Sequence, residues 1–362
     1  MEGFKELINH LTGPTTFFLV SVAVVVLGLV FVKQVTRPRF GLAMLAGSIA
    51  FTIFATTDPN FGEIISKPDN VPILMLLGSV GFFTWFALRR GVVNDERRAR
   101  GEDLLEVEAG KGGDKNTFVW PDLVYTELIA MVVGGVLLLV WSIFLKAPLE
   151  PPANPTKAPN PSKAPWYFLG LQEMLVYYDP WIAGVLLPTF IIVGLMALPY
   201  IDVNPRGNGY YTFKERWFAI SMFLFGFIVL WTLLILLGTF LRGPNWNFFG
   251  PFEFWDPHKV EPLVNVNLSE IIWVKFLNTS LPSNPLIRES FGFLAVIVYL
   301  LALPPLFAKT LFKKFYQDLG FVRYNIMMNL FLMMMSLPVK MFLRWAFNLK
   351  YIVAIPEVFF NI

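Results

Sequence analysis

The hydrophobic pattern divides the chain into long apolar stretches separated by short polar segments. A helix needs about 20 mainly apolar residues to cross the hydrocarbon core of a bilayer, and roughly 17 is the lower limit. Seven stretches meet this requirement, at residues 16–32, 40–56, 71–88, 123–145, 181–201, 217–241 and 291–308. The pattern therefore predicts an all-α polytopic membrane protein with seven to eight transmembrane helices.

An eighth apolar stretch, residues 326–339, is shorter than the others. At a helical rise of about 1.5 Å per residue it reaches only about 21 Å before Lys340. Two arrangements fit: the helix continues past Trp345 and crosses the membrane, or it kinks at Pro338 and lies in the interface. In the second arrangement we expect Lys340 and Arg344 to extend their charged ends toward the lipid head groups.

Composition excludes several classes of function. Apolar residues make up 56% of the chain and charged residues 15%, against about 25% charged residues in an average soluble protein. A net charge of +3 is too small for a nucleic-acid-binding surface. The chain has no cysteine, and its two histidines, His10 and His258, are far apart in the sequence. We therefore expect no thiolate chemistry, no haem-ligating histidine pair and no metal site in this chain.

Lysine and arginine are distributed unequally between alternate loops. One set of loops carries 17 of these residues, and the opposite set, which includes the N-terminus, carries 9. Cytoplasmic loops hold the excess of Lys and Arg in membrane proteins. We therefore expect the N-terminus and the loops 146–180 and 242–290 on the outer side, and the loop 89–122 in the cytoplasm. This last loop mixes acids and bases around GKGGDK, which is typical of a solvated linker and not of a phosphate-binding loop.

A proline-rich stretch follows the fourth predicted span and leads into a short apolar segment. The stretch contains PANP and continues into APWYFLGLQEML, and the next span ends in LPYIDVNP. Prolines keep the first part extended, whereas residues 166–176 lack proline and suit a short helix at the membrane surface. This series of motifs resembles the C-terminal half of cytochrome b in cytochrome bc-type complexes, and in layout it is similar to subunit IV of the cytochrome b6f complex. The resemblance extends over residues 123–241 and on through the span that ends at Ala308.

The resemblance implies a role in quinol oxidation within a multi-subunit complex. In this family the loop after the first matching helix forms a wall of the outer quinol-oxidation pocket. There a quinol gives one electron to a Rieske iron-sulfur protein and the other to b haems, and protons are released outward. The chain is then a subunit of a quinol:cytochrome c (or plastocyanin-like acceptor) oxidoreductase in a respiratory chain, with menaquinone among the candidate quinones. The implied location is a bacterial inner, energy-transducing membrane.

The same resemblance implies which cofactors and partners the chain needs. The family's haem ligands are histidine pairs, which this sequence lacks, so the b haems and the iron-sulfur cluster belong to other subunits. The implied partners are a haem-binding cytochrome b N-terminal-type subunit, a Rieske iron-sulfur protein and a c-type cytochrome, besides membrane lipids.

Candidate site residues in the outer loop follow from the alignment of its aromatic motif. Trp166 and Tyr167 match the last two residues of the family's Pro-Glu-Trp-Tyr, so Pro165 stands in place of the Glu that is thought to accept a quinol proton. We expect Pro165, Trp166, Tyr167 and Phe168 to bind the quinone. Glu173 is the nearest substitute acid, because seven residues along a helix return to the face of Trp166. The catalytic candidates are thus Glu173 and Tyr167; the alternatives are a surface acid and an interfacial aromatic.

Polar residues also follow the fifth predicted span. Asp202 and Arg206 stand where the family's second quinone site lies, at the inner side, and are further quinone-binding candidates. The expected domain organisation is a three-helix membrane extension at 1–88, a charged cytoplasmic linker at 89–122, cytochrome b C-terminal-like helices at 123–311, and an interfacial or transmembrane helix at 312–362.

Two rival hypotheses belong to other classes. The first is a haem-free quinone-binding membrane anchor of another respiratory or photosynthetic oxidoreductase assembly. The second is a transporter, for which we would expect internal repeats, broken helices and polar groups at the membrane midplane. The sequence shows neither obvious repeats nor a midplane charge pair, which disfavours the transporter.

Overall fold

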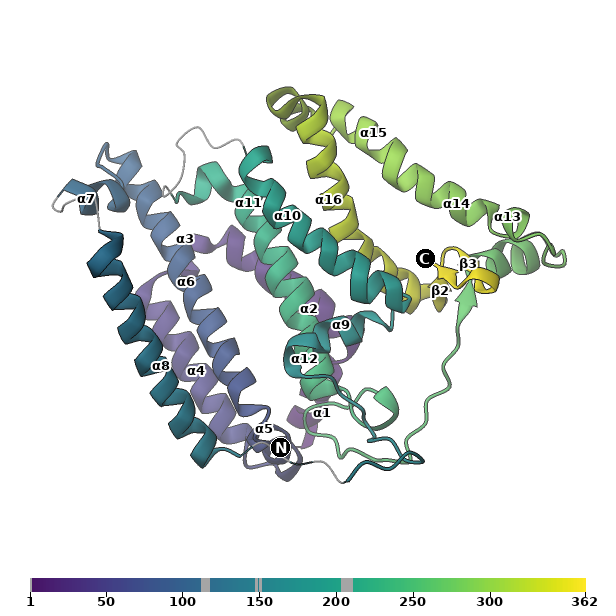
Figure 1. Ribbon diagram of the computed structural model, residues 1–362, viewed down its shortest axis with the longest axis horizontal. Helices are drawn as coiled ribbons and strands as arrows, with labels where there is room; N and C mark the ends of the chain where they lie inside the picture. The colour runs from purple at the N-terminus through teal and green to yellow at the C-terminus, as the bar shows by residue number, and fades with distance from the viewer. Residues whose placement is uncertain (1, 112–117, 147–148, 150–151, 203–210) are drawn as a thin grey trace. The chain divides into compact units, whose positions relative to one another are not determined.

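The computed structural model describes residues 2–111, 118–146, 149, 152–202 and 211–362, and these are mainly helical (Figure 1). Within these ranges seven helices are long and apolar enough to cross a membrane: Pro38–Ala55, Val71–Ala99, Val119–Phe144, Ile182–Ile201, Phe213–Leu241, Ser290–Lys309 and Lys313–Phe347. A bent pair, Glu2–Leu11 with Pro14–Val30, makes eight if it counts as one span. The prediction of an all-α polytopic membrane protein with seven to eight spans is confirmed.

The chain forms two compact units, and the first comprises Met1–Ser162, Arg206–Phe225 and Thr239–Pro257. Its described helices are α1 (Glu2–Leu11), α2 (Pro14–Val30), α3 (Val32–Val35), α4 (Pro38–Ala55), α5 (Pro59–Ser66), α6 (Val71–Ala99), α7 (Leu105–Lys111), η1 (Val119–Leu123), α8 (Val124–Phe144), α11 (Phe213–Leu224) and the short η6 (Pro244–Trp246). Proline at the first or second position begins α2, α4, α5 and α6, where its missing N–H would have no helical partner.

A cap and a small aromatic cluster hold the start of this unit together. The Asp58 carboxylate accepts hydrogen bonds from the backbone N–H groups of Asn60 (3.0 Å) and Phe61 (3.1 Å), which caps α5, and it also pairs with Lys5 of α1. The Phe61 ring stacks on Phe252 with centroids 5.3 Å apart. Helix α1 is thereby fixed against α5 through one ion pair at the start of the unit.

Helix α6 continues eleven residues past Leu88, where its apolar stretch was predicted to end. The reason is a polar junction at Asn94, which is fully buried. Its side chain donates to Glu106 (2.8 Å) and to the carbonyl of Tyr211 (2.8 Å), and it accepts from the N–H of Leu105 at the start of α7 (3.0 Å). Residues 89–111 of the expected linker therefore form an ordered helical pair. Helix α8, by contrast, contains no buried residue.

The second unit comprises Lys163–Pro205, Gly226–Gly238 and His258–Ile362. Its helices are η2 (Trp166–Phe168), α9 (Leu169–Met174), η3 (Ile182–Leu186), α10 (Leu187–Ile201), α12 (Leu233–Leu236), η7 (Glu270–Phe276), α13 (Pro285–Arg288), α14 (Ser290–Ile297), η8 (Val298–Ala302), α15 (Leu303–Lys309), α16 (Lys313–Phe347) and η9 (Pro356–Val358). Segments η4 (Phe225–Thr232) and η5 (Leu237–Leu241) join α11 and α12 into the single helix Phe213–Leu241.

Four very short strands complete the second unit. Strand β1 (Val266–Asn267) pairs in parallel with β2 (Leu349–Tyr351), with Val266 opposite Leu349. Strand β3 (Ala354–Ile355) pairs in antiparallel fashion with β4 (Phe360–Asn361), with Ala354 opposite Asn361. The β1–β2 pair attaches the residues after α16 to the loop before α14, and the β3–β4 pair lies within residues 348–362.

Helix α16 settles the arrangement of the eighth apolar stretch. Its helical conformation is interrupted at Gly320 and then continues through Pro338 to Phe347, so the helix does not end at Pro338 and is long enough for a span. Lys340 and Arg344 do not extend to solvent either, since only 2% and 9% of their surfaces are exposed. The Lys340 ammonium donates to the carbonyl of Lys350 (2.7 Å), and the Arg344 guanidinium donates to that of Val264 (2.9 Å). Strand β2 and the residues just before β1 thus supply carbonyls to these two charged groups in place of water.

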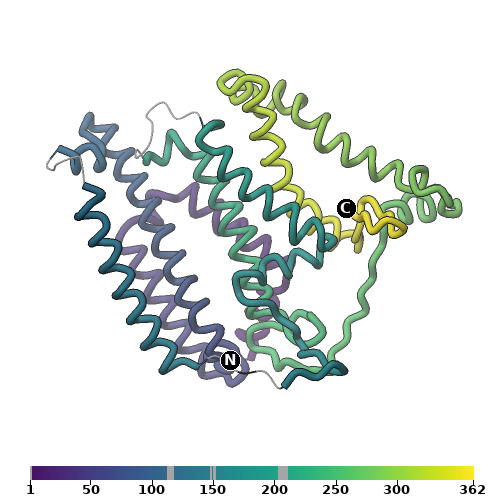
Figure 2. The backbone as a smooth tube through the Cα atoms, viewed as in Figure 1, coloured from purple at the N-terminus to yellow at the C-terminus, as the bar shows by residue number. Residues whose placement is uncertain are grey.

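Three loop segments of the second unit gather at one end of its spans. Residues 175–181 precede α10, residues 285–289 precede α14, and residues 348–362 follow α16; side chains link the last segment to both others. Figure 2 shows the yellow end of the trace beside the starts of these helices. The parts of the loops 146–180 and 242–290 that these segments include therefore lie at the same end of this unit's spans.

Candidate functional site

The segment that leads into α10 begins with a proline-capped turn. Pro165 precedes η2, and its carbonyl accepts from the N–H of Phe168 (2.8 Å). The side chain of Gln172, one turn further on, accepts from the N–H of Ala164 (2.9 Å). This bond ties the end of the proline-rich stretch to α9, so residues 164–174 form one short folded piece.

The three aromatic residues of η2 are the exposed part of this piece. Tyr167 is 49% exposed, and its ring lies between those of Trp166 and Phe168, with centroids 5.7 Å and 4.6 Å away. Trp166 and Phe168 are also exposed. A cluster of aromatic rings with one accessible hydroxyl can stack on a planar ligand and offer it a hydrogen bond.

The opposite face of α9 packs tightly on α12. A Cβ atom on Gly170 would lie 3.3 Å from Cγ1 of Ile235, and one on Gly238 would lie 3.1 Å from the carbonyl oxygen of Leu169. These two glycines permit the close approach, because at both points the neighbouring helix occupies the space of a side chain. The helix Phe213–Leu241 thus fixes how closely α9 packs against it.

Glu173 belongs to this buried face. None of its surface is exposed, so the alternative of a surface acid in contact with solvent is wrong. Trp166, seven residues earlier, is exposed, and the two do not share an environment. The 3-10 turn at η2 changes the angular relation that a continuous α-helix would give them. Glu173 and Tyr167 therefore lie on the buried and exposed sides of the same short piece.

Residues after α9 anchor the segment to the spans. The hydroxyl of Tyr178 and that of Ser336 in α16 are hydrogen-bonded at 2.7 Å, and burial raises the pKa of Tyr178 above its ordinary value. The carboxylate of Asp179 accepts from the hydroxyl of Tyr351 (3.0 Å). Its backbone carbonyl accepts from the N–H of Ile182 (3.1 Å), at the first turn of the fifth span.

Asp202 lies away from these residues. It ends α10, and its N–H donates to the carbonyl of Leu198 (2.9 Å). The 20-residue helix Ile182–Ile201 separates it from the aromatic piece, which corresponds to about 30 Å. Arg206, the other candidate at that end, lies outside the described residues. The candidates thus form two groups at opposite ends of one span.

Comparison with known proteins identifies the region that contains the first group. Residues 152–250 match the family described as cytochrome b(C-terminal)/b6/petD. No solved structure matches the chain. The chain is thus a multi-pass membrane protein with a match to a family found in quinol oxidoreductase complexes of electron transport. Within it, residues 152–250 are a cytochrome b C-terminal-type region, which confirms the resemblance to the C-terminal half of cytochrome b. The match covers less of the chain than the expected 123–308.

Among the described residues, no group of three or more His, Asp or Glu side chains is placed to hold a metal ion. Sequence reasoning did not find the residues after α16 that touch the candidate segment, namely Lys350, Tyr351 and Asn361. They are about 170 positions away in the chain, and no local motif marks them. The only sequence signal was the polar ending of an otherwise apolar helix.

Proposed function

We propose that this subunit forms part of the outer quinol-oxidation pocket of a cytochrome bc-type complex, with the piece 164–174 as one wall. The observation that carries the proposal is the position of the exposed ring cluster at Trp166–Phe168 inside the region of cytochrome b C-terminal type. In this proposal Pro165 and the three aromatic residues contact the quinol ring, and the Tyr167 hydroxyl donates to or accepts from a quinol oxygen.

Oxidation of a quinol releases two protons and two electrons. We assign the electrons to a Rieske iron-sulfur protein and to b haems on a cytochrome b N-terminal-type subunit, and from there to a c-type cytochrome. Glu173 is our candidate for a proton acceptor. Because it is buried within this chain, a proton reaches it through a group or a water beside α9, and not from open solvent. Asp202 and Arg206 are proposed contacts for a second quinone at the inner side.

The remaining parts of the proposal concern organisation. We propose that residues 1–88 are a membrane extension of the family core, that 89–122 face the cytoplasm, that 123–311 form the core, and that 312–362 complete it. We place the N-terminus and the segments 146–180 and 242–290 on the outer side of a bacterial inner membrane. The excess of Lys and Arg in the opposite loops supports this orientation.

The first test is composition of the native complex. The complex is purified in mild detergent, its subunits are identified, and a dithionite-reduced minus oxidised spectrum is recorded. We expect a b-haem band, a Rieske protein and a separate haem-bearing subunit. An intact complex without b haem would overturn the proposal in favour of a haem-free quinone-binding anchor.

The second test addresses the residues. Tyr167→Phe should raise the KM for quinol several-fold, and Glu173→Gln should lower kcat and remove one limb of its pH profile. Tyr200→Phe and Glu261→Gln are matched controls, since both side chains are exposed and lie outside the piece 164–174. Turnover of both variants equal to that of the controls would remove Tyr167 and Glu173 from the mechanism.

A further inference from the structure

Residues 348–362, here called the strap, fold back across the end of the second unit. Asn348 takes a left-handed conformation (φ 53°), which ends α16 and turns the chain. After β2 the backbone closes on itself, with the N–H of Ile352 donating to the carbonyl of Ile362 (2.6 Å) and the N–H of Ile362 to that of Val353 (2.9 Å). The strap is thus a folded element, and it contacts two separate loops.

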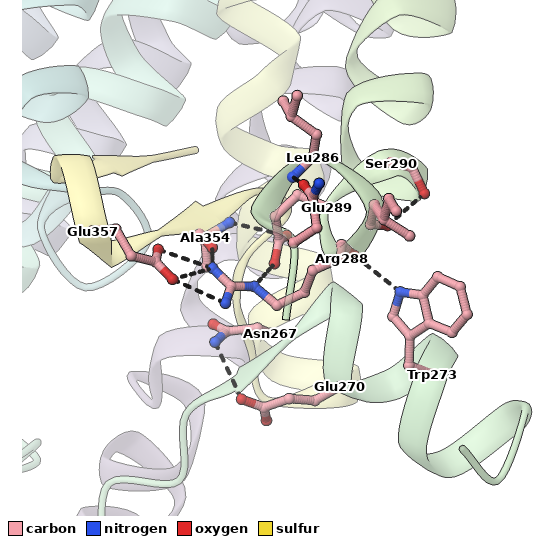
Figure 3. A network of polar contacts seen from close by, with 11 residues as sticks. Asn267, Glu270, Trp273, Leu286, Arg288, Glu289, Ser290, Ala354 and Glu357 are labelled. Carbon is pink, nitrogen blue, oxygen red and sulfur yellow. Dashed lines mark hydrogen bonds and ion pairs between the residues drawn. The ribbon is translucent and has the colours of Figure 1, made fainter. Parts of the chain in front are cut away.

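Its first attachment is to the start of α14 (Figure 3). The Arg288 guanidinium binds the Glu357 carboxylate through both of its terminal nitrogens, each at 3.0 Å. Glu289, which is buried, accepts from the N–H of Ala354 (3.1 Å). The charge of Arg288 lowers the pKa of Glu357, so this attachment is ionised at neutral pH. It fixes the strap to a span that is not part of the candidate site.

Its second attachment is to the segment between α9 and α10. The Lys350 ammonium donates to the carbonyls of Leu175 (2.7 Å) and Val176 (3.1 Å). These carbonyls belong to the two residues that directly follow α9, whose own last carbonyls accept from the backbone N–H groups of residues 175–178. Lys350 therefore holds the turn that follows α9.

Two further residues of the strap, Phe360 and Asn361, hold the same segment. Asn361 donates to the Asp179 carboxylate (3.4 Å), and its own carbonyl accepts from the indole N–H of Trp181 (2.9 Å). The Trp181 ring also stacks on Phe360, with centroids 5.5 Å apart. Together with the Tyr351 bond to Asp179, the strap contacts the segment at its beginning and at its end.

These contacts matter for α9 because it is only six residues long. A helix of this length does not persist without tertiary support. Its start is tied by Gln172 and its buried face rests on Gly238, and Lys350 holds the two carbonyls that directly follow its last residue.

We propose that the strap is a positioning element for the candidate site, and that Lys350 is the residue through which it holds α9 in place. This inference rests on the proposed function only in its consequence for quinol, because the mechanical part concerns the chain alone. The groups around Lys350 are Arg344, Asp179, Lys340 and Tyr351, and the strap is held together by hydrogen bonds to carbonyls as much as by ion pairs.

The experiment compares Lys350→Met, Lys350→Arg and the control Lys275→Met in the purified complex. Lys275 is an exposed lysine of the same unit on η7. Hydrogen exchange is measured on peptides covering 163–181, and quinol turnover is measured alongside. We expect exchange in 169–178 to accelerate about tenfold or more in Lys350→Met, since hydrogen bonds to a charged group are lost. The arginine variant should restore protection, and the control should match the wild type.

Outcomes for the strap and for the proposed function are separable. Unchanged hydrogen exchange in Lys350→Met overturns the proposal that the strap positions α9, whatever the quinol turnover. If exchange changes in Lys350→Met but the wild-type complex oxidises no quinol, the positioning role of the strap is supported and the proposed function is overturned. If both hold, KM for quinol should rise while the b-haem spectrum stays unchanged, which a general loss of folding would not produce. Should Lys350→Met fail to assemble, Tyr351→Phe serves as the milder variant, with a several-fold rise in exchange near Asp179 expected and no rise counting against the proposal.

Discussion

Gly238→Ala tests the packing that supports the candidate site. In the native chain a Cβ at this position would lie 3.1 Å from the carbonyl oxygen of Leu169 and 3.3 Å from its Cβ, closer than ordinary van der Waals contact. The atom that would have to yield belongs to the backbone of α9, so the whole short helix must shift by a few tenths of an ångström. Overpacking of this kind typically destabilises by about 1–3 kcal/mol.

An opposing effect reduces the net change. Alanine is favoured over glycine inside a helix by up to about 1 kcal/mol. The expected net loss of stability is about 1–2 kcal/mol. This would raise the population of molecules in which α9 is displaced by a factor of roughly 5–30. Gly134→Ala is the matched control, because Gly134 also lies within a membrane span and nothing approaches its side-chain position within 4 Å.

The assay is hydrogen exchange over 169–174 together with thermal unfolding of the purified complex. We expect faster exchange and a lower melting temperature for Gly238→Ala, and neither for Gly134→Ala. If the two variants behave alike, the close approach of α9 to the helix Phe213–Leu241 is refuted. The inference that this contact holds α9 in place, with Glu173 on its buried face, then fails as well.

Three further predictions concern charged groups. Glu357→Gln removes the partner of Arg288, but Glu357 is exposed, so we expect only a small fall in the melting temperature, and a fall as large as that of Gly238→Ala would contradict this account. Burial opposes ionisation of Asp58, but hydrogen bonds from Lys5 and from the backbone of α5 outweigh it and lower its pKa. Its stabilising effect is therefore present above the ordinary pKa and lost as pH falls through the lower folded value. In unfolding measured against pH, Asp58→Asn should remove this acid dependence; an unchanged acid limb would refute it. Burial and nearby Arg344 lower the pKa of Lys350 to about 8, so Lys350 loses its proton at a lower pH in the attached strap than in the detached strap, where its pKa is the ordinary 10.5 of lysine. Attachment of the strap to the segment after α9 should therefore strengthen as pH rises between these two pKa values. It is measured as hydrogen-exchange protection corrected for the intrinsic rate, and Lys350→Met should abolish the trend.

The spans could be predicted from sequence because each depends on local composition. An apolar stretch of sufficient length has few alternatives to a transmembrane helix. The short helix after the proline-rich stretch was predicted for a similar local reason, since proline is absent from 166–176.

The environment of charged residues could not be predicted in the same way. In the interfacial arrangement Lys340 and Arg344 were expected at the lipid head groups. Instead they donate hydrogen bonds to the carbonyls of Lys350 and Val264. Glu173 was placed on the face of Trp166 by assuming one continuous α-helix, and the 3-10 turn at η2 removed that relation. In the first case a segment distant in the chain decides the environment, and in the second a local change of helix type does. Neither produces a periodic signal in the sequence.

Two tyrosine hydroxyls of the last two spans are satisfied within this helical pair. The Tyr299 hydroxyl in η8 donates to the carbonyl of Leu332 (2.6 Å), and the Tyr324 hydroxyl in α16 donates to the carbonyl of Pro304 (2.9 Å). An unpaired hydroxyl in hydrocarbon is unfavourable by several kcal/mol, on the order of the stability of a small domain. Because both tyrosines donate to carbonyls within the pair, neither hydroxyl needs a third helix as its hydrogen-bond acceptor.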